Sequence, residues 1–112
     1  MGYYTDFDLT IAPGPPQSVR DSMSNKLREI TDWGVEDIIA HGEFYDTKWY
    51  DYREDMIKLS ESFPEYKFIL NGHGEEKDDI WRAWFSNGKS YSVKAQIVWP
   101  DFCWETMNIH VL

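Results

Sequence analysis

The chain has 112 residues, of which 42% are hydrophobic and 28% are charged. This length and composition predict one globular domain and exclude both a disordered chain and a second core. No run approaches the ~20 apolar residues that a membrane span requires, and the first ten residues lack the basic and apolar regions of a secretory signal. The single cysteine, Cys103, fits a reducing compartment. We therefore expect a cytoplasmic protein without a membrane partner.

The charge balance is acidic, with 20 acidic residues against 11 basic ones and a formal net charge of −9. Proteins that bind a phosphate backbone draw much of their affinity from Lys and Arg. This chain has no cluster of them, which argues against a nucleic-acid partner. The acidity favours a basic partner, or serves only to keep the protein soluble.

Aromatic residues make up 17% of the chain, which is more than a core of this size needs. Either some of them are exposed, where binding energy concentrates, or several small clusters cover both faces of a sheet.

The first predicted element is a strand over residues 3–11, in which apolar and polar side chains alternate. The proline-rich segment 12–16 then suits the first turn of a helix. Apolar residues at helical spacing predict that this helix covers residues 19–30. A short second helix over residues 35–39 is expected to end at Gly42.

Residues 43–50 are ambiguous, because their aromatics suit either a short strand or an ordered loop. Asp51 and Glu54 have the spacing of a capping box, which predicts a helix over residues 51–63. A strand over residues 66–71 follows. The buried stripe of the helix is predicted to consist of Tyr52, Met56, Leu59 and Phe63.

The strongest local signal is Asn87-Gly88, which lies between two runs of alternating apolar and polar residues. Both central positions of a type I′ turn need a positive φ, which Gly accepts and Asn tolerates. The sequence therefore predicts a hairpin of two strands, over residues 80–85 and 90–99, that ends at Pro100 because proline has no N–H to donate.

These elements predict an α+β fold, a two-layer sandwich of a largely antiparallel four-stranded sheet with two main helices on one face. The domain is expected to span residues 1–102, with a C-terminal tail over residues 103–112. In the tail, Ile109 and Val111 could add an edge strand, pair with a second molecule, or fray.

A sheet covered on one side leaves an open face. The residues expected to point to the helices are Phe7, Phe68, Leu70, Phe85 and Val93. The residues expected on the open face are Tyr4, Asp6, Asp8, Lys67, Ile69, Arg82, Trp84, Lys94 and Gln96. Such a face can serve as a docking platform, or its Trp and Arg can simply pack across strands.

Residues 72–79 form the densest polar segment, with four carboxylates and His73. The spacing does not match a calcium-binding loop, and two glycines followed by acids do not make a phosphate cradle. The segment is therefore either a solvated acidic turn or a site for a cation or a basic partner. We identify no catalytic residues, no metal ligand set and no cofactor.

Several motifs stand in a recognisable order: Lys48-Trp-Tyr-Asp51, GHGEEKDDIWRAWF over residues 72–85, Asn87-Gly-Lys89 and Pro100-Asp-Phe102. Together with the MGYYT start, they resemble a group of small uncharacterised proteins found largely in tailed bacteriophages and related bacterial loci. The resemblance implies an accessory protein that acts in the cytoplasm of a bacterial host, where small acidic phage proteins often inhibit defence or housekeeping machinery.

We therefore expect a non-enzymatic protein that binds a bacterial host protein, as an anti-defence or host-takeover inhibitor. The alternatives are a domain that binds a small ligand, nucleotide or metal, including an enzyme of that kind, and a self-associating virion or assembly component. The residues expected to contact the host protein are Tyr4, Glu75, Glu76, Asp78, Asp79, Trp81, Arg82 and Trp84.

Overall fold

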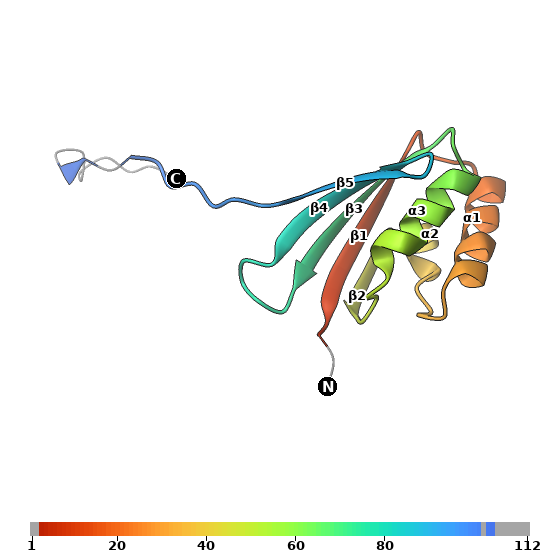
Figure 1. Ribbon diagram of the computed structural model, residues 1–112, viewed down its shortest axis with the longest axis horizontal. Helices are drawn as coiled ribbons and strands as arrows, with labels where there is room; N and C mark the ends of the chain where they lie inside the picture. The colour runs from red at the N-terminus through yellow and green to blue at the C-terminus, as the bar shows by residue number, and fades with distance from the viewer. Residues whose placement is uncertain (1–2, 102, 105–112) are drawn as a thin grey trace.

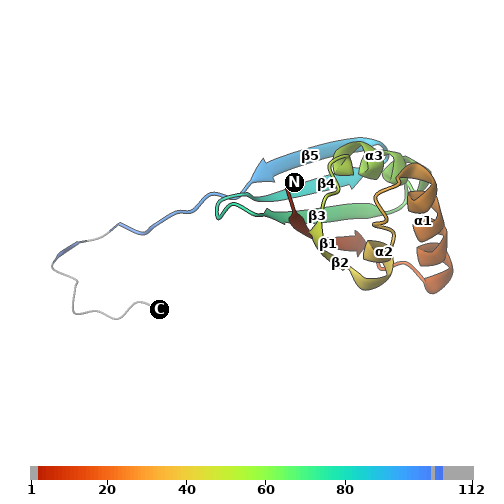
Figure 2. The same cartoon turned by 90° about the horizontal axis from the view of Figure 1, so that it is seen from below.

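The computed structural model describes residues 3–101 and 103–104, and within them five strands and three helices. In chain order these are β1 (Thr5–Ala12), α1 (Gln17–Ile30), α2 (Asp37–His41), β2 (Glu43–Thr47), α3 (Tyr52–Ser62), β3 (Lys67–Gly74), β4 (Ile80–Ser86) and β5 (Lys89–Lys94). The strands form one sheet in the order β2-β1-β3-β4-β5, and every pairing is antiparallel. All three helices lie on one face of this sheet (Figure 1, Figure 2).

The predicted α+β class and the antiparallel sheet with helices on one face are confirmed, whereas the predicted number of strands is wrong. The fifth strand is β2, the segment that the sequence left ambiguous, and it pairs with β1 at one edge of the sheet. Only Thr47 of its five residues is buried, so the sequence of β2 carries little of the alternation that marks a strand with one buried face.

The helices follow their predicted stripes. Met23 and Leu27 of α1 are fully buried, as are Met56 and Leu59 of α3. Helix α2 ends at Gly42, whose φ of 77° lies in the left-handed region that glycine adopts freely.

The predicted capping box at the start of α3 is wrong. Asp51 has φ −94° and ψ 22°, not the extended backbone of a capping residue, and its side chain makes no capping hydrogen bond. Its carboxylate instead accepts a hydrogen bond from the indole N–H of Trp33, at 3.2 Å.

The core fills the space between the helices and one face of the sheet. The strand residues buried there are Phe7, Leu9, Phe68, Leu70, Ala83 and Phe85. The largest fully buried side chain is Trp49, which follows β2, and its indole N–H donates a 2.8 Å hydrogen bond to the buried Asp55 carboxylate of α3. This bond fixes the segment between β2 and α3 against the helix.

The hairpin of β4 and β5 has the predicted two-residue turn, with φ 48° at Asn87 and 79° at Gly88. The register places Tyr91 opposite Trp84 and Val93 opposite Arg82. Residues opposite each other in a ladder share a face, so Val93 lies on the open face. The prediction that it points to the helices is therefore wrong.

The same register corrects Lys94, which was expected on the open face. Lys94 lies opposite Trp81 and so belongs to the face that the helices cover. The prediction relied on apolar character alone, and it therefore assigned Val93 and Lys94 each to the wrong face of the sheet.

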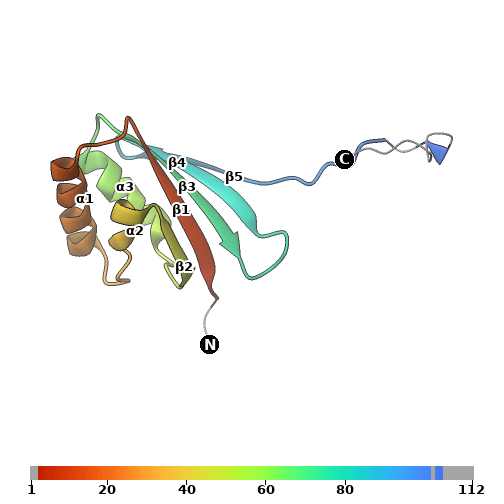
Figure 3. The ribbon, with the colours of Figure 1, turned by 180° about the vertical axis from the view of Figure 1, so that it is seen from behind.

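The last predicted strand is too long. Strand β5 ends at Lys94, and residues 95–101, which we call the arm, run away from the sheet (Figure 1, Figure 3). The reason is that β4 begins at Ile80, so the chain beyond Ala95 has no neighbouring strand to pair with. Gln96, predicted on the open face, lies in the arm. The predicted tail contacts of Ile109 and Val111 fall outside the described residues.

None of the helices in the described part of the chain has the length and apolarity needed to cross a lipid bilayer.

Candidate functional site

The acidic turn, residues 75–79, joins β3 to β4 at one end of the sheet. It is shorter than predicted, because Gly72 and His73 belong to β3. Its base is closed by a 2.8 Å hydrogen bond from the Gly74 N–H to the Asp79 carbonyl oxygen.

Two of its four carboxylates hold the N-terminal segment. The Tyr3 hydroxyl donates to Asp79 Oδ2 at 2.6 Å, and the Tyr4 N–H donates to Glu75 Oε1 at 2.8 Å. The Glu76 N–H in turn donates to the Tyr3 hydroxyl oxygen, at 3.2 Å. Glu75 and Asp79 therefore attach β1 to the turn.

This attachment has two physical consequences. A side chain at Gly74 would overlap the Asp79 carboxylate and the Tyr3 ring, so a larger residue there would displace this hydrogen-bonded pair. The hydrogen bond to the Asp79 carboxylate also raises the pKa of Tyr3 above its ordinary value of 10.0. Glu76 and Asp78 are exposed, which leaves their charges available to a partner.

The open face of the sheet has an acidic half over β1 and β2. Asp8 lies opposite both Glu43 and Asn71, and Asp6 lies opposite His73. Near them the pKa of Tyr45 is raised, chiefly by a hydrogen bond to the Glu43 carboxylate.

A row of hydrogen bonds crosses the middle of this face. Asn71 donates from Nδ2 to Asp8 Oδ1 at 2.7 Å, and its Oδ1 accepts from Arg82 Nε at 2.6 Å. The row connects β1, β3 and β4, and it fixes the direction of the Arg82 side chain.

The other half of the open face, over β3, β4 and β5, is apolar. We call this set the apolar strip, and it consists of Ile69, Ile80, Trp84, Tyr91 and Val93. Ile80, Trp84 and Val93 are 39%, 36% and 40% exposed, and Tyr91 is 66% exposed. The rings of Trp84 and Tyr91 contact each other, with centroids 5.8 Å apart.

The structure divides the predicted contact residues among three places. Arg82 and Trp84 lie on the open face, while Glu75, Glu76, Asp78 and Asp79 form the acidic turn. Tyr4 lies beside the turn, 40% exposed, with the Lys48 ammonium 5.1 Å from its ring centroid.

Trp81 lies apart from these residues. It is half-buried on the helix-covered face, where it stacks on Tyr52 with ring centroids 4.5 Å apart. A side chain at Gly72 would overlap the Trp81 indole, so this glycine provides the space for that ring. Trp81 therefore cannot act on the same surface as Arg82 and Trp84.

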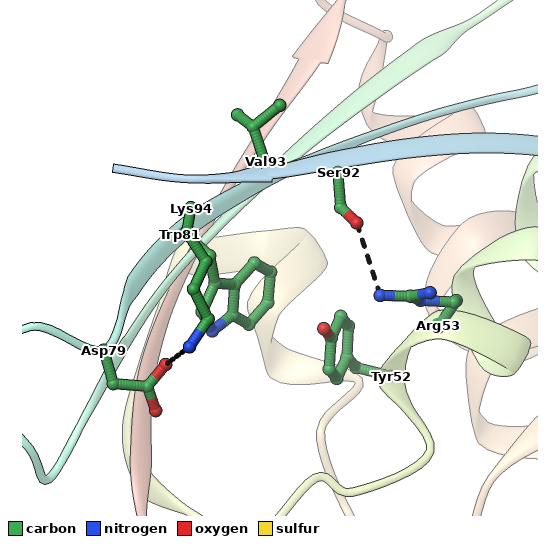
Figure 4. A pocket seen from close by; sticks show the side chains of 7 residues that line it. All are labelled: Tyr52, Arg53, Asp79, Trp81, Ser92, Val93 and Lys94. Atoms are coloured by element: carbon green, nitrogen blue, oxygen red, sulfur yellow. Dashed lines mark hydrogen bonds and ion pairs between the residues drawn. The ribbon is translucent and has the colours of Figure 1, made fainter. Parts of the chain in front are cut away.

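A pocket of about 270 Å³ opens beside this stacked pair, between the start of α3 and β5 (Figure 4). Tyr52 and Trp81 line it together with two cationic side chains, Arg53 and Lys94, and one anionic side chain, Asp79. Lys94 Nζ lies 3.9 Å from Asp79 Oδ1, and Arg53 Nη2 donates to Ser92 Oγ at 3.3 Å. These contacts point Arg53 and Lys94 toward the same space.

The sequence interpretation did not include Ile80, Tyr91 and Val93 among the contact residues. The signal that identifies them is the Asn87-Gly88 turn, because a two-residue turn places residues equally far from it opposite each other. Tyr91 then has to share a face with Trp84, and Val93 with Arg82.

Among the described residues, no group of three or more His, Cys, Asp or Glu side chains is arranged to hold a metal ion. Comparison of the chain with models of known protein families, with curated proteins and with solved structures finds no match.

Proposed function

We propose that the protein is a non-enzymatic binding domain that engages a bacterial host protein, as an inhibitor of host defence or of other host machinery. The observation that carries the proposal is the apolar strip, which lies uncovered on the open face beside a charged Arg82.

The composition of the strip favours a protein as the partner. Binding energy at protein interfaces concentrates in Trp, Tyr and Arg, and here Trp84, Tyr91 and Arg82 are neighbours on two adjacent strands. The acidic turn and the acidic half of the same face flank them. The matching partner surface is an apolar patch with basic residues around it.

The proposal that the partner belongs to a bacterial host rests on the resemblance to small bacteriophage proteins. This resemblance is strongest over residues 48–102. That range includes the acidic turn, both strands of the β4–β5 hairpin and the whole arm. We propose an inhibitory role because a small domain with an exposed binding face can block a surface of its target.

Affinity capture from bacterial lysate tests this proposal. The tagged wild type is compared with a variant that carries Glu76→Lys and Asp78→Lys, two exposed charges outside the hydrogen bonds of the turn. We expect the wild type to retain a host protein that salt releases, and the variant to lose it. Glu75 and Asp79 are left unchanged because they hold the N-terminal segment.

The matched control carries Glu29→Lys and Glu65→Lys, which make the same change in net charge at exposed positions away from the turn. It should capture the same protein as the wild type. Equal loss in both variants would mean that only net charge matters, and equal retention in both would remove the turn from the site.

A second candidate function rests on the pocket in Figure 4, which places Arg53 and Lys94 beside a stacked pair of aromatic rings. We propose a small anionic ligand, such as a nucleotide, for this space. Its volume of about 270 Å³ lies just below the ~300–1,000 Å³ that is usual for ligand pockets, which restricts the ligand to a small one.

Thermal melts with a panel of nucleotides and small carboxylic acids test this candidate. A ligand that fits should raise the melting temperature of the wild type but not that of the Arg53→Ala, Lys94→Ala double variant. A flat melting temperature across the panel would exclude it.

A further inference from the structure

We propose that a second copy of this chain pairs antiparallel with β5, so that the arm of each copy lies along β5 of the other. The inference goes beyond the proposed function and does not depend on it, since it concerns the edge of the sheet. Of the apolar strip, only Tyr91 and Val93 on the edge strand would gain neighbours, and the rest of the open face would stay uncovered.

Among the strands that the structure describes, none pairs with the outer edge of β5. Strand β5 is the last strand of the sheet, and all six of its residues are exposed. Exposed edges present unpaired N–H and C=O groups and invite another strand unless a proline, a bulge or a cover blocks them. In β5 no proline and no register shift interrupts the pairing with β4.

The opposite edge differs. Strand β2 has a register shift in its pairing with β1, and Asp46 has a φ of 51°, which bends the strand. These features disfavour the addition of a strand at β2 and leave β5 as the edge open to pairing.

The backbone of β5 has a defined outward side. The Ala95 N–H donates to the Ile80 carbonyl oxygen at 2.8 Å, so Ala95 directs its backbone groups toward β4. Backbone directions alternate along a strand. Ser92 and Lys94 therefore direct their N–H and C=O groups outward, and in the arm Gln96 and Val98 continue this series.

The arm has the properties of an unpaired strand. Ile97, Val98 and Trp99 are 70%, 80% and 82% exposed, because no other part of the described chain covers them. The alternation that begins with Tyr91 and Val93 continues through Ala95, Ile97 and Trp99. A second strand beside residues 91–99 would therefore bury a continuous apolar row.

A two-fold axis at Ala95 gives a register in which apolar residues of one copy lie opposite apolar residues of the other. Tyr91 then lies opposite Trp99 of the second copy, and Val93 lies opposite its Ile97. Because Ala95 directs its backbone toward β4, these pairs do not share hydrogen bonds across the new ladder, which is the arrangement that brings side chains closest.

The charges agree with this register. Lys94 lies opposite Gln96 of the second copy, and Lys89 lies opposite its Asp101. Pro100 falls opposite Ser90 and ends the ladder, since it has no N–H to donate.

The neighbouring symmetric registers pair side chains that match less well. An axis at Lys94 places two lysines directly opposite each other, and like charges in that position are destabilising. An axis at Gln96 places Tyr91 opposite Asp101 and Lys94 opposite Val98. The axis at Ala95 is therefore the one that the sequence of the edge and the arm favours.

Sedimentation equilibrium of the full chain tests the pairing. The average mass of the wild type should rise from the monomer mass of 13.3 kDa toward twice that mass as its concentration increases. Ile97→Asp places a charge in the apolar row and should give a monomer. Val98→Asp adds the same charge to a side chain that is also largely exposed but lies on the other face of the arm, and this variant should still associate.

Cysteine pairing tests the register itself. In a Cys103→Ser background, Ala95→Cys brings two thiols opposite each other at a Cα separation of about 4.5 Å, which permits a disulfide. Gln96→Cys separates its two thiols by about two residues along the strands, which is too far for one. We expect mild oxidation to link the first variant into dimers and to leave the second unlinked.

A wild type that stays monomeric at its highest soluble concentration would overturn the proposal. So would a dimer that survives Ile97→Asp, or one in which Gln96→Cys links and Ala95→Cys does not.

Discussion

The hydrogen bond between Trp49 and Asp55 is the most buried polar contact between side chains in the described part of the chain. Trp49 is 2% exposed and Asp55 is 5% exposed, so neither group can turn to water. Buried donors that lose their acceptor cost the full desolvation of the group.

We therefore expect Asp55→Ala to lower the free energy of unfolding by about 1–3 kcal/mol, because the Trp49 indole N–H would lose its acceptor. Asp55→Asn keeps an oxygen at this position and should cost less. Urea denaturation followed by tryptophan fluorescence measures both. Equal stability of Asp55→Ala and the wild type would show that the bond contributes nothing.

Tyr3 predicts a pH dependence of stability. Its pKa is raised in the folded protein, chiefly by the hydrogen bond to Asp79, so folding favours the protonated hydroxyl. The stability that this bond contributes is fully present below the ordinary pKa of about 10 and is lost as the pH rises through the folded value.

Tyr3→Phe should accordingly destabilise the protein at neutral pH, and the difference from the wild type should shrink above pH 10. Thermal melts of both proteins between neutral and alkaline pH measure this. Tyr45, whose pKa is also raised, is present in both proteins and cancels in the comparison. A difference that stays constant with pH would contradict the role given to Asp79.

At the scale of the elements, close packing against β3 requires a residue without a side chain at Gly72. Gly72 leaves room for the Trp81 indole, which packs against Phe7 and Tyr52 under α3. Any side chain at Gly72 would push this ring out of its place.

Gly72→Ala should therefore lower the free energy of unfolding by about 1–3 kcal/mol, the usual cost of overpacking. Gly14→Ala is the matched control, because nothing lies within 4 Å of the position of its added methyl group. It should change stability by less than about 0.5 kcal/mol. Urea denaturation compares the two, and equal effects would mean that Trp81 moves aside without cost.

The sequence predicts those elements whose signals are local. Asn87-Gly88 has the backbone angles of the predicted turn, and Gly42 ends its helix as expected. Features that depend on a distant partner were not predictable in the same way. Residues 95–99 alternate like a strand, yet a strand needs a neighbour, and β4 starts only at Ile80.

The open face was only partly predicted, for a related reason. Arg82 and Trp84 were placed on it correctly, whereas Val93 and Lys94 were exchanged because apolar character was taken to mean burial. In an edge strand both faces are exposed, so hydrophobicity does not show which face points to the core. The register of the turn does show it.

At the scale of the whole molecule, the two faces of the sheet differ in their surroundings. One face packs against three helices and contains the core, while the other carries an acidic half and the apolar strip. A net charge of −9 extends this acidity over the molecule and would steer a basic partner toward it.

Substitutions on the open face should therefore affect binding far more than folding. Trp84 and Trp33 allow a direct comparison, because they are 36% and 37% exposed. Trp84 belongs to the apolar strip, and Trp33 lies in the helix layer between α1 and α2.

Calorimetric titration of the captured host protein with the wild type, Trp84→Ser and Trp33→Ser measures the importance of the open face most directly. We expect Trp84→Ser to weaken binding roughly 30-fold or more, as the loss of a central aromatic contact does, and Trp33→Ser to bind like the wild type. Wild-type affinity in Trp84→Ser, with or without a loss in Trp33→Ser, would contradict the assignment of the binding surface to the open face.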